Sequence, residues 1–476
     1  MYHVKAGGCL EKIYSTVGIR FPKTKGNMLK NERYSFQIAF LSRWTGMEEC
    51  KIKVTSELSE RISWRVVEYA NGKYTLPDNH DDYYIFNKNV FTTFPDILKP
   101  FGKTDLFLRA NLWTSVWFTV DGATHEGAYD IRIELFDKEN NPMCECQYKL
   151  EVLNAMLPPC DIPVLQRLNL ECICDYHRIT PFSDAFAEVF NKYLKSYVLH
   201  GNNALNISLF SNKMKAVIVS KINSAYVFNL DNLQNLVFLA KKAGITYFAF
   251  CVRGGEDFMS DFSPVLHAFL AENDILQNSF IYVNEKELVS ANGERSVSVL
   301  PIHQFEAKIR EIEEGNSVWI SYDQTESYGH YTNRFLNCSL QRLRVLGFQM
   351  YLSKAQGFSH WAFNYYYDKT GKQLLNPHQD TDGLGGWPSG EAFLVYPSYP
   401  NEKAEIYDSV RLEAFANAIE DYRAMRLLEK CRGREFAVKY LEKKGFYGFS
   451  VYPSDLDEHL WIREEINTLI QGELQE

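Results

Sequence analysis

The residues best suited to chemistry stand directly after short apolar runs in the middle of the chain. Carboxylate and imidazole groups can move protons, and aromatic rings can stack on the flat faces of ligands. These residues are Asp175, Tyr176, His177 and Arg178 after the first run, Asn284 and Glu285 after the fourth, Tyr322 and Asp323 after a later one, and Asn364 and Tyr365 after the run that contains Trp361. If the runs are parallel strands, these side chains converge at one end of the sheet. Taken singly, a polar residue in such a place more often only faces water.

Several other kinds of site have no counterpart in the sequence. There is no phosphate-binding Gly-x-x-x-x-Gly-Lys-Ser/Thr loop, and Arg253-Gly254-Gly255-Glu256 lacks the glycine spacing of a dinucleotide loop. His-Glu-x-x-His, Cys-x-x-Cys and Gly-x-Ser-x-Gly patterns are also missing. We therefore expect no metal and no cofactor.

The apolar runs alternate with amphipathic stretches. The runs are Leu168–Cys174, Ala204–Phe210, Thr246–Val252, Ser279–Val283, Val297–Leu300, Val318–Tyr322 and Phe358–Phe363, and the stretches between them include Asp184–Leu199, Leu230–Ala243, Gln304–Glu314 and Phe335–Ala355. Strand and helix in turn predict parallel strands with crossover helices. Seven strands over about 240 residues fit a TIM-type (β/α) barrel better than an open sheet.

The spacing after the fourth run departs from a complete barrel. Only about ten residues separate Glu285 from the run at Val297, whereas a crossover between parallel strands needs a dozen or more. The sequence therefore predicts a barrel that is short of one βα unit.

The two ends of the chain follow other patterns. Period-two alternation at Tyr34–Phe40, Ile62–Val67, Ser115–Val120 and Tyr129–Leu135 predicts an antiparallel β-sandwich, and the residues from Ser409 onward have helical spacing. Three prolines between Leu157 and Pro163 are typical of a linker. We therefore expect a β-sandwich domain over residues 1–156, the barrel over 157–408, and a C-terminal helical extension packed on the barrel over 409–476.

Composition limits the partners. With 51 Lys and Arg against 60 Asp and Glu, the formal net charge of −9 argues against nucleic acid. No run approaches the roughly 20 apolar residues that cross a bilayer, so we expect no membrane partner. The first residues lack the pattern of an export signal, which favours a cytoplasmic protein, or a periplasmic or secreted one if a signal has been removed. The oligomeric state is left open.

A series of motifs in the last third of the sequence resembles one enzyme family. The motifs are Asn333-Arg334-Phe335-Leu336, Arg344–Phe348, Gly357–Asn364, Pro388–Pro397, Ser409–Glu413 and Glu420–Ala424. In order and spacing they resemble the catalytic domain of glycoside hydrolase family 123, also called domain of unknown function 4091. Weaker similarity extends through Cys174–Arg178 and His200–Asn203. Pro95–Leu98, Ser115–Trp117 and Leu157-Pro158 are similar to the family's N-terminal domain.

The resemblance implies a retaining glycoside hydrolase that removes terminal β-linked N-acetylgalactosamine, or N-acetylglucosamine, from glycans. In such substrate-assisted enzymes the 2-acetamido oxygen of the sugar attacks the anomeric carbon. An Asp-Glu pair after a barrel strand serves this reaction, and the matching residues here are Asn284 and Glu285. Glu285 would be the general acid and base, and Asn284 would orient the acetamido group.

The resemblance also suggests sugar contacts. Tyr322 could hydrogen-bond the acetamido carbonyl, and Trp361 could form the floor of the sugar pocket. His177, Asn364, Asp380 and Asp382 complete the predicted substrate-binding set. The same residues have plainer uses: a capped strand for Tyr322, a core position for Trp361 and tight-turn chemistry for the two aspartates.

The sequence departs from the family at several of these positions. Asn284 replaces an aspartate, Ile179 fills another acidic position, and Glu391 stands where relatives have aspartate. An amide stabilises a positively charged intermediate less than a carboxylate does. The chain is therefore identified as a divergent member, and the alternative is a catalytically lapsed relative that acts as a carbohydrate-binding protein.

Overall fold

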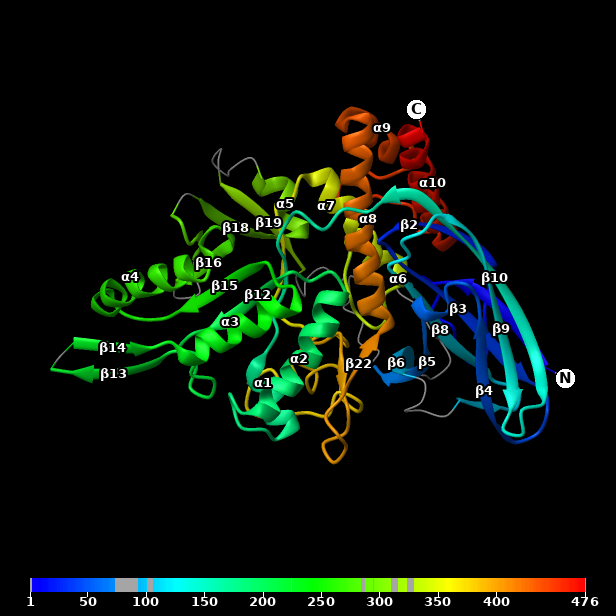
Figure 1. Cartoon of the computed structure of the whole chain (residues 1–476), viewed down its shortest axis with the longest axis horizontal. Helices are drawn as coiled ribbons and strands as arrows, with labels where there is room; N and C mark the ends of the chain where they lie inside the picture. The colour runs from blue at the N-terminus through cyan, green and yellow to red at the C-terminus, as the bar shows by residue number, and fades with distance from the viewer. Residues whose placement is uncertain are drawn as a thin grey trace.

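The computed structural model describes residues 2–72, 93–100, 106–223, 225–283, 287–293, 295–309, 316–322 and 329–475. In Figure 1 the N-terminal sheets lie on the right and a second, larger strand-and-helix layer lies on the left. Helix α8 (Val410–Arg432) runs between them. The chain is thus multidomain, with its N-terminal and middle parts joined along one helix.

The N-terminal part consists of two sheets. One has the order β1-β3-β8-β5-β6-β22-β21 and the other β2-β10-β9-β4-β7, and the pairs are antiparallel except for β10 with β2. Their strands are β1 (Tyr2–Gly8), β2 (Lys25–Lys30), β3 (Arg33–Ser42), β4 (Met47–Thr55), β5 (Ile62–Asn71), β6 (Thr93–Pro100), β7 (Leu106–Arg109), β8 (Trp113–Asp121), β9 (Gly127–Asp137), β10 (Pro142–Met156), β21 (Tyr396–Pro397) and β22 (Ile406–Ser409), with a 3-10 turn, η1 (Ser59–Arg61), before β5.

The two sheets share an apolar core. Phe36 on β3 stacks on Phe118 of the same sheet and on Tyr148 of the other, with ring centroids 5.2 and 4.0 Å apart. Such cross-sheet packing follows from the alternation that the sequence shows, because every second side chain of a strand faces the same side. The four strands predicted here lie within β3, β5, β8 and β9.

The middle of the chain forms an eight-stranded sheet with the order β11-β20-β19-β18-β17-β16-β15-β12. Its strands are β11 (Val164–Gln166), β12 (Ala204–Ser208), β15 (Tyr247–Val252), β16 (Ser279–Val283), β17 (Glu287–Ser290), β18 (Ser296–Pro301), β19 (Ser317–Ser321) and β20 (Phe358–His360). The two end strands approach each other, because Asn203, just before β12, bonds the main chain of Val164 through its own nitrogen and through Oδ1. The sheet is therefore a nearly closed barrel.

Strand direction shows where this barrel is irregular. Every pair is parallel except those of β17, which is antiparallel to both β16 and β18. Between Val283 and Ser296 the described residues contain this one strand and no helix. A reversed strand thus occupies the position at which the sequence predicts a missing βα unit.

The first predicted strand is wrong. Residues Leu170–His177 form helix α1, and the strand that precedes it, β11, has only three residues. Asn169 caps this helix by accepting a hydrogen bond from the Cys172 nitrogen at 2.8 Å. The run was apolar enough for a buried strand, but Leu170, Ile173 and Cys174 follow helical spacing and face one core.

Most of the helices belong to the barrel part of the chain, and the C-terminal end of the chain is also helical. They are α1, α2 (Asp184–Leu199), α3 (Asp231–Ala243), α4 (Glu256–Glu272), α5 (Ile302–Lys308), α6 (Leu340–Arg344), α7 (Leu346–Ser353), α8, α9 (Arg434–Lys443) and α10 (Leu456–Gln475), with a 3-10 turn η2 (Leu276–Asn278) and a hairpin of β13 (Ile218–Ile222) and β14 (Ala225–Asn229). Helix α2 has the predicted bounds. Within the described ranges, none of the helices is both long and apolar enough to cross a membrane.

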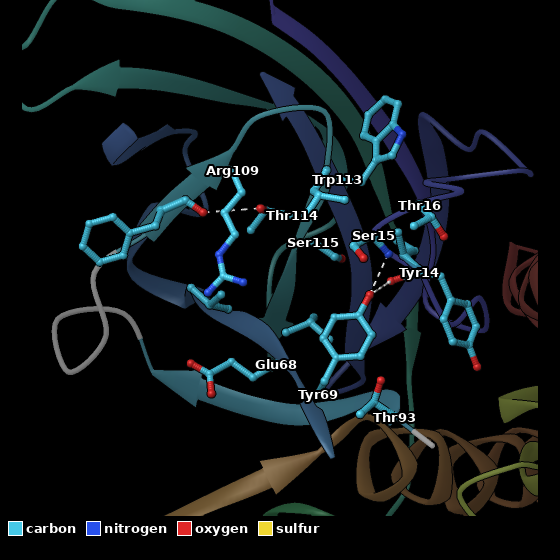
Figure 2. A pocket seen from close by; sticks show the side chains of 15 residues that line it. Tyr14, Ser15, Thr16, Glu68, Tyr69, Thr93, Arg109, Trp113, Thr114 and Ser115 are labelled. Carbon is cyan, nitrogen blue, oxygen red and sulfur yellow. Dashed lines mark hydrogen bonds between the residues drawn. The ribbon is translucent and has the colours of Figure 1, made fainter. Parts of the chain in front are cut away.

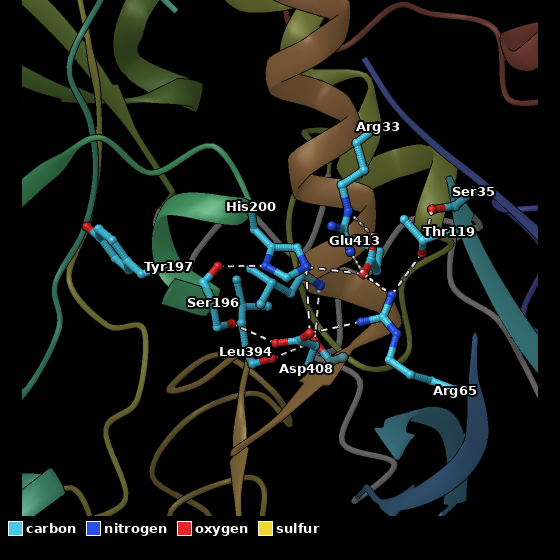
Figure 3. Close-up of polar contacts among 12 residues, drawn as sticks. Arg33, Ser35, Arg65, Thr119, Ser196, Tyr197, His200, Leu394, Asp408 and Glu413 are labelled. Atoms are coloured by element: carbon cyan, nitrogen blue, oxygen red, sulfur yellow. Dashed lines mark hydrogen bonds and ion pairs between the residues drawn. The ribbon is translucent and has the colours of Figure 1, made fainter. Parts of the chain in front are cut away.

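A buried ion network joins the domains at α8 (Figure 3). Glu413 on α8 is 0% exposed and lies 2.7 Å from Arg33 Nη2 and 3.1 Å from His200 Nε2. Arg65 Nη2 also bonds Glu413, and its Nη1 lies 2.9 Å from Asp408. His200, Asp408 and Glu413 are close enough to share a metal ion, but the two guanidinium groups already supply the positive charge. The network therefore holds the N-terminal sheet, the barrel and α8 together.

Removing the Glu413 carboxylate tests this junction. Glu413→Ala leaves two buried arginines without their shared counter-charge, and we expect it to lower the free energy of unfolding by about 3–5 kcal/mol. Urea denaturation of the purified variant measures the loss. Glu435→Ala, which removes a solvent-exposed carboxylate on α9, is the control and should leave the midpoint unchanged. Equal midpoints for both variants would contradict the role of the network.

Candidate active site

A cavity of about 380 Å³ opens at the carboxyl ends of the barrel strands. Seven of the eight strands, or the residues directly after them, contribute to its lining. Its polar and aromatic side chains are Arg167, Asn206, Tyr282, Ser321, Tyr322, Ser359, His360 and Trp361. A concave site with a few convergent polar groups at this end of a parallel sheet is the usual place for a small-molecule ligand.

Two predicted sugar contacts, Tyr322 and Trp361, line this cavity. Tyr322 is 5% exposed, and its ring meets Phe358 and His360 edge-on at 5.2 and 5.7 Å. Trp361 is half-buried against Trp387, with ring centroids 5.1 Å apart. Both rings are thus held by packing before any ligand arrives.

Glu391 anchors the indole of Trp361 from behind. Glu391 is 0% exposed, and its Oε1 accepts a hydrogen bond from Trp361 Nε1 at 2.8 Å. The same oxygen lies 3.4 Å from His360 Nε2. One buried carboxylate therefore contacts two residues of the cavity wall.

The charge of Glu391 is maintained by its neighbours. Burial alone would raise the pKa of Glu391, but contacts with His360, Arg334 and Trp361 hold that pKa below its ordinary value. Burial lowers the pKa of Arg334 to about 9, and Glu391 opposes that shift. Arg334 Nη2 also donates to the Glu391 carbonyl at 2.6 Å. Glu391 is therefore ionised, and Arg334 supplies a compensating positive charge beside it.

His360 is neutral in this setting. Burial, together with the charge of Arg334, lowers the pKa of His360. Its Nδ1 lies 3.0 Å from the Ala362 carbonyl oxygen and 3.2 Å from the Ala362 nitrogen.

The predicted catalytic pair, Asn284 and Glu285, lies outside the described residues. The described chain reaches Val283, the last residue of β16, and the side chain of Tyr282 lines the cavity. Burial raises the pKa of Tyr282. The strand that leads to the pair thus ends at the cavity.

The other predicted contacts do not line the cavity. His177 ends helix α1, where Nε2 lies 3.2 Å from the Tyr193 hydroxyl, and burial lowers its pKa to about 4. Asn364 is fully buried and uses both ends of its amide on the main chain of Asn169, at 2.7 and 3.0 Å.

Asp380 and Asp382 shape a loop. Asp380 Oδ1 accepts from the Asp382 nitrogen at 3.1 Å, and Asp382 Oδ1 accepts from the Gly385 nitrogen at 3.0 Å. These are the local bonds of tight turns. The structure therefore groups Tyr322 and Trp361 and leaves the remaining four predicted contacts elsewhere.

Sequence reasoning gave no site role to Arg167, His360 and Glu391. Arg167 follows a strand too short to be recognised, and Glu391 contacts Trp361 across 30 residues of sequence. His360 and Glu391 both fall within motifs of the family resemblance, which was the one available signal.

A second cavity of about 630 Å³ lies among β5, β7, β8 and the segment after β1 (Figure 2). The Tyr69 hydroxyl accepts a hydrogen bond from the Ser15 nitrogen at 2.6 Å, and Glu68 and Arg109 also contribute. None of the predicted site residues lines it. The barrel cavity is therefore the candidate active site.

Together, the nearly closed barrel and its cavity place a candidate ligand site at the carboxyl ends of the strands. The family model described as "Glycoside hydrolase 123, catalytic domain" matches residues 268–428. That segment contains β16, the cavity residues Tyr282, Tyr322 and Trp361, and Glu391. Residues 268–428 thus match the family 123 catalytic domain, and the resemblance found in the motifs is confirmed.

Solved structures give the same fold. A family 123 glycoside hydrolase from Clostridium perfringens, described for its hydrolysis of glycolipid glycans, matches with a TM-score of 0.67 at 13% identity over 100% of this chain and 98% of that one. The N-terminal domain of PorA and the BIgI domain of the S. agalactiae beta protein each cover 32% of this chain, at 9% and 8% identity and over 99% and 96% of their own chains, and their TM-scores of 0.18 and 0.15 are too low to indicate a common fold. No curated protein matches the chain in sequence.

Substitution of Glu391 tests its role in the cavity wall. Glu391→Ala removes the acceptor of Trp361 Nε1 and the carboxylate beside Arg334, and we expect a loss of about 3–5 kcal/mol in the free energy of unfolding. Glu391→Gln keeps an acceptor and should lose less, about 1–3 kcal/mol.

Denaturation and the indole N–H signal of Trp361 in ¹⁵N-tryptophan-labelled protein provide the two measurements. Trp361→Phe assigns that signal. Wild-type stability and an unshifted signal in both Glu391 variants would contradict the assigned contacts.

Proposed function

We propose that the protein is a retaining β-N-acetylhexosaminidase that removes terminal N-acetylgalactosamine, or N-acetylglucosamine, from glycans by substrate assistance. The observation that carries the proposal is the cavity at the end of β16, the strand that leads directly to Asn284 and Glu285. The family 123 catalytic-domain match over residues 268–428 supports a glycan substrate. The cavity, at about 380 Å³, has room for one sugar ring and part of a second.

The proposed reaction has two steps. First, the acetamido oxygen of the substrate attacks the anomeric carbon, the glycosidic C–O bond breaks, and Glu285 gives its proton to the leaving oxygen. Second, water attacks the anomeric carbon of the oxazolinium ion, which has kept its N–H, and gives a proton to Glu285. The five-membered ring opens, the acetamido group is restored and the configuration is retained. Asn284 orients the acetamido group through its amide.

The cavity wall would serve the sugar in two ways. Trp361, fixed by Glu391, offers a ring face on which the sugar can stack. Tyr322, held between Phe358 and His360, can direct its hydroxyl to the acetamido carbonyl. We assign His177, Asn364, Asp380 and Asp382 an indirect part, because their polar atoms bond neighbouring loops and helices.

The proposed organisation assigns catalysis to the TIM-type barrel domain over residues 157–408. The β-sandwich over 1–156 and the helical extension over 409–476 would support it. The Glu413 network, which links all three, favours their working as one unit.

Replacement of Glu285 tests the proposed acid and base. With aryl β-N-acetylgalactosaminide and β-N-acetylglucosaminide as substrates, Glu285→Gln should lower kcat by about 10²–10⁴-fold, because an amide cannot exchange the proton. Glu272→Gln, an exposed carboxylate at the end of α4, is the matched control and should keep wild-type rates. Rates for Glu285→Gln equal to wild type would defeat the proposal, and absence of turnover with retained sugar binding would favour the lapsed, binding-only relative.

The nucleophile is tested separately. In a series of aryl substrates with N-acetyl, N-fluoroacetyl, N-difluoroacetyl and N-trifluoroacetyl groups, kcat/KM should fall steadily, since fluorine withdraws electrons from the attacking oxygen. Asn284→Asp should raise kcat by about tenfold, because a carboxylate stabilises the positive intermediate better than an amide does. A flat fluorine series would exclude substrate assistance.

A further inference from the structure

Arg167 is the one described residue of the cavity lining with a permanently charged side chain. Its main chain is bonded to β20 and the segment after it: its nitrogen donates to the His360 carbonyl at 2.8 Å, and its carbonyl accepts from the Phe363 nitrogen at 2.9 Å. Arg167 is half-buried. A positive charge is thus held in place where β11 meets the cavity.

Within the described part of the chain, the guanidinium of Arg167 has few partners. Nη2 donates to Ser208 Oγ at 3.3 Å, and no carboxylate oxygen of the described residues lies within 4 Å of its nitrogens. A guanidinium carries five N–H donors in a planar fork. Glu391, the buried carboxylate behind the wall, is already engaged by Trp361 and His360. Most of the donors of Arg167 are therefore available to a ligand.

We infer that the cavity selects an amino sugar with an oxyanion close to the reacting ring, and that Arg167 binds this oxyanion. The inference rests on the proposed function and names its substrate class. The oxyanion is a sulfate ester on the N-acetylgalactosamine itself or the carboxylate of the next sugar. Both present two oxygens to the fork of an arginine, which lysine or an amide cannot match.

If Arg167 had another role, its removal would change the rates on neutral and anionic substrates in a different ratio. If its charge acts on the reacting carboxylate instead, its removal slows neutral and anionic substrates equally. If it recognises the substrate, its removal affects only the anionic ones. The ratio of the two effects therefore separates the roles.

The experiment compares the full-length wild type, Arg167→Gln and the control Arg178→Gln, which removes an exposed arginine just past α1. Isothermal titration measures binding of N-acetylgalactosamine, its 6-sulfate and its 4-sulfate. Glu285→Gln, with and without Arg167→Gln, is titrated with N-acetylgalactosaminyl-β-1,4-glucuronic acid. The kcat/KM values are measured on the aryl glycosides with and without sulfate.

We expect one anionic ligand to bind about 10- to 100-fold more tightly than neutral sugar, and this preference to vanish in Arg167→Gln but not in Arg178→Gln. Preference for a sulfated sugar identifies the ester, and preference for the disaccharide identifies the carboxylate. Tighter anion binding that depends on Arg167 supports the inference even if no substrate is hydrolysed.

Turnover without any anionic preference would overturn the inference while leaving the proposed function intact. An equal loss on neutral and anionic substrates in Arg167→Gln would also overturn it. Failure to bind or hydrolyse any of these sugars would overturn both.

Discussion

The pairing of Arg411 with Asp96 is the contact on which the rest of the structure depends. Arg411 lies on α8 and Asp96 on β6, they are 1% and 0% exposed, and Nη2 and Oδ2 are 2.9 Å apart. Burying two charges costs several kcal/mol each unless they are paired and hydrogen-bonded. Arg411 Nη1 also donates to the carbonyls of Gly390 at 2.7 Å and Arg334 at 3.1 Å, and these hydrogen bonds offset the free energy of burying the two charges. An N-terminal strand, α8 and two barrel loops therefore have to assemble together.

The same contacts lead to the candidate active site. Gly390 has a positive φ of 87°, and a side chain there would come within 2.7 Å of the Arg411 guanidinium, so the loop can approach α8 only with glycine. The next residue is Glu391, which contacts His360 and Trp361. One turn of chain thus connects a charge pair between domains with the geometry of the barrel cavity.

Much of the fold could be predicted from the sequence, because alternation and amphipathic spacing are local properties. The bounds of α2 and four strands of the N-terminal sheets, β3, β5, β8 and β9, follow from them. The strand predicted at Leu168–Cys174 is wrong for two reasons. The real strand, β11, has only three residues and leaves no periodicity in the sequence, and helix α1 after it is as apolar as a strand. The cavity role of Arg167 could not be predicted, because it arises from contacts with residues far away in the sequence, whereas Glu391 stands out only through the family motif that contains it.

The most direct measurement of the central claim is a crystal structure of the protein with a non-hydrolysable β-thioglycoside of N-acetylgalactosamine. The account predicts that the sugar ring lies against Trp361 in the cavity at the strand ends. The carboxyl group of Glu285 should lie within hydrogen-bond distance of the glycosidic sulfur. A sugar bound only in the cavity of the N-terminal sheets, or a Glu285 side chain directed away from the bound ring, would contradict the account.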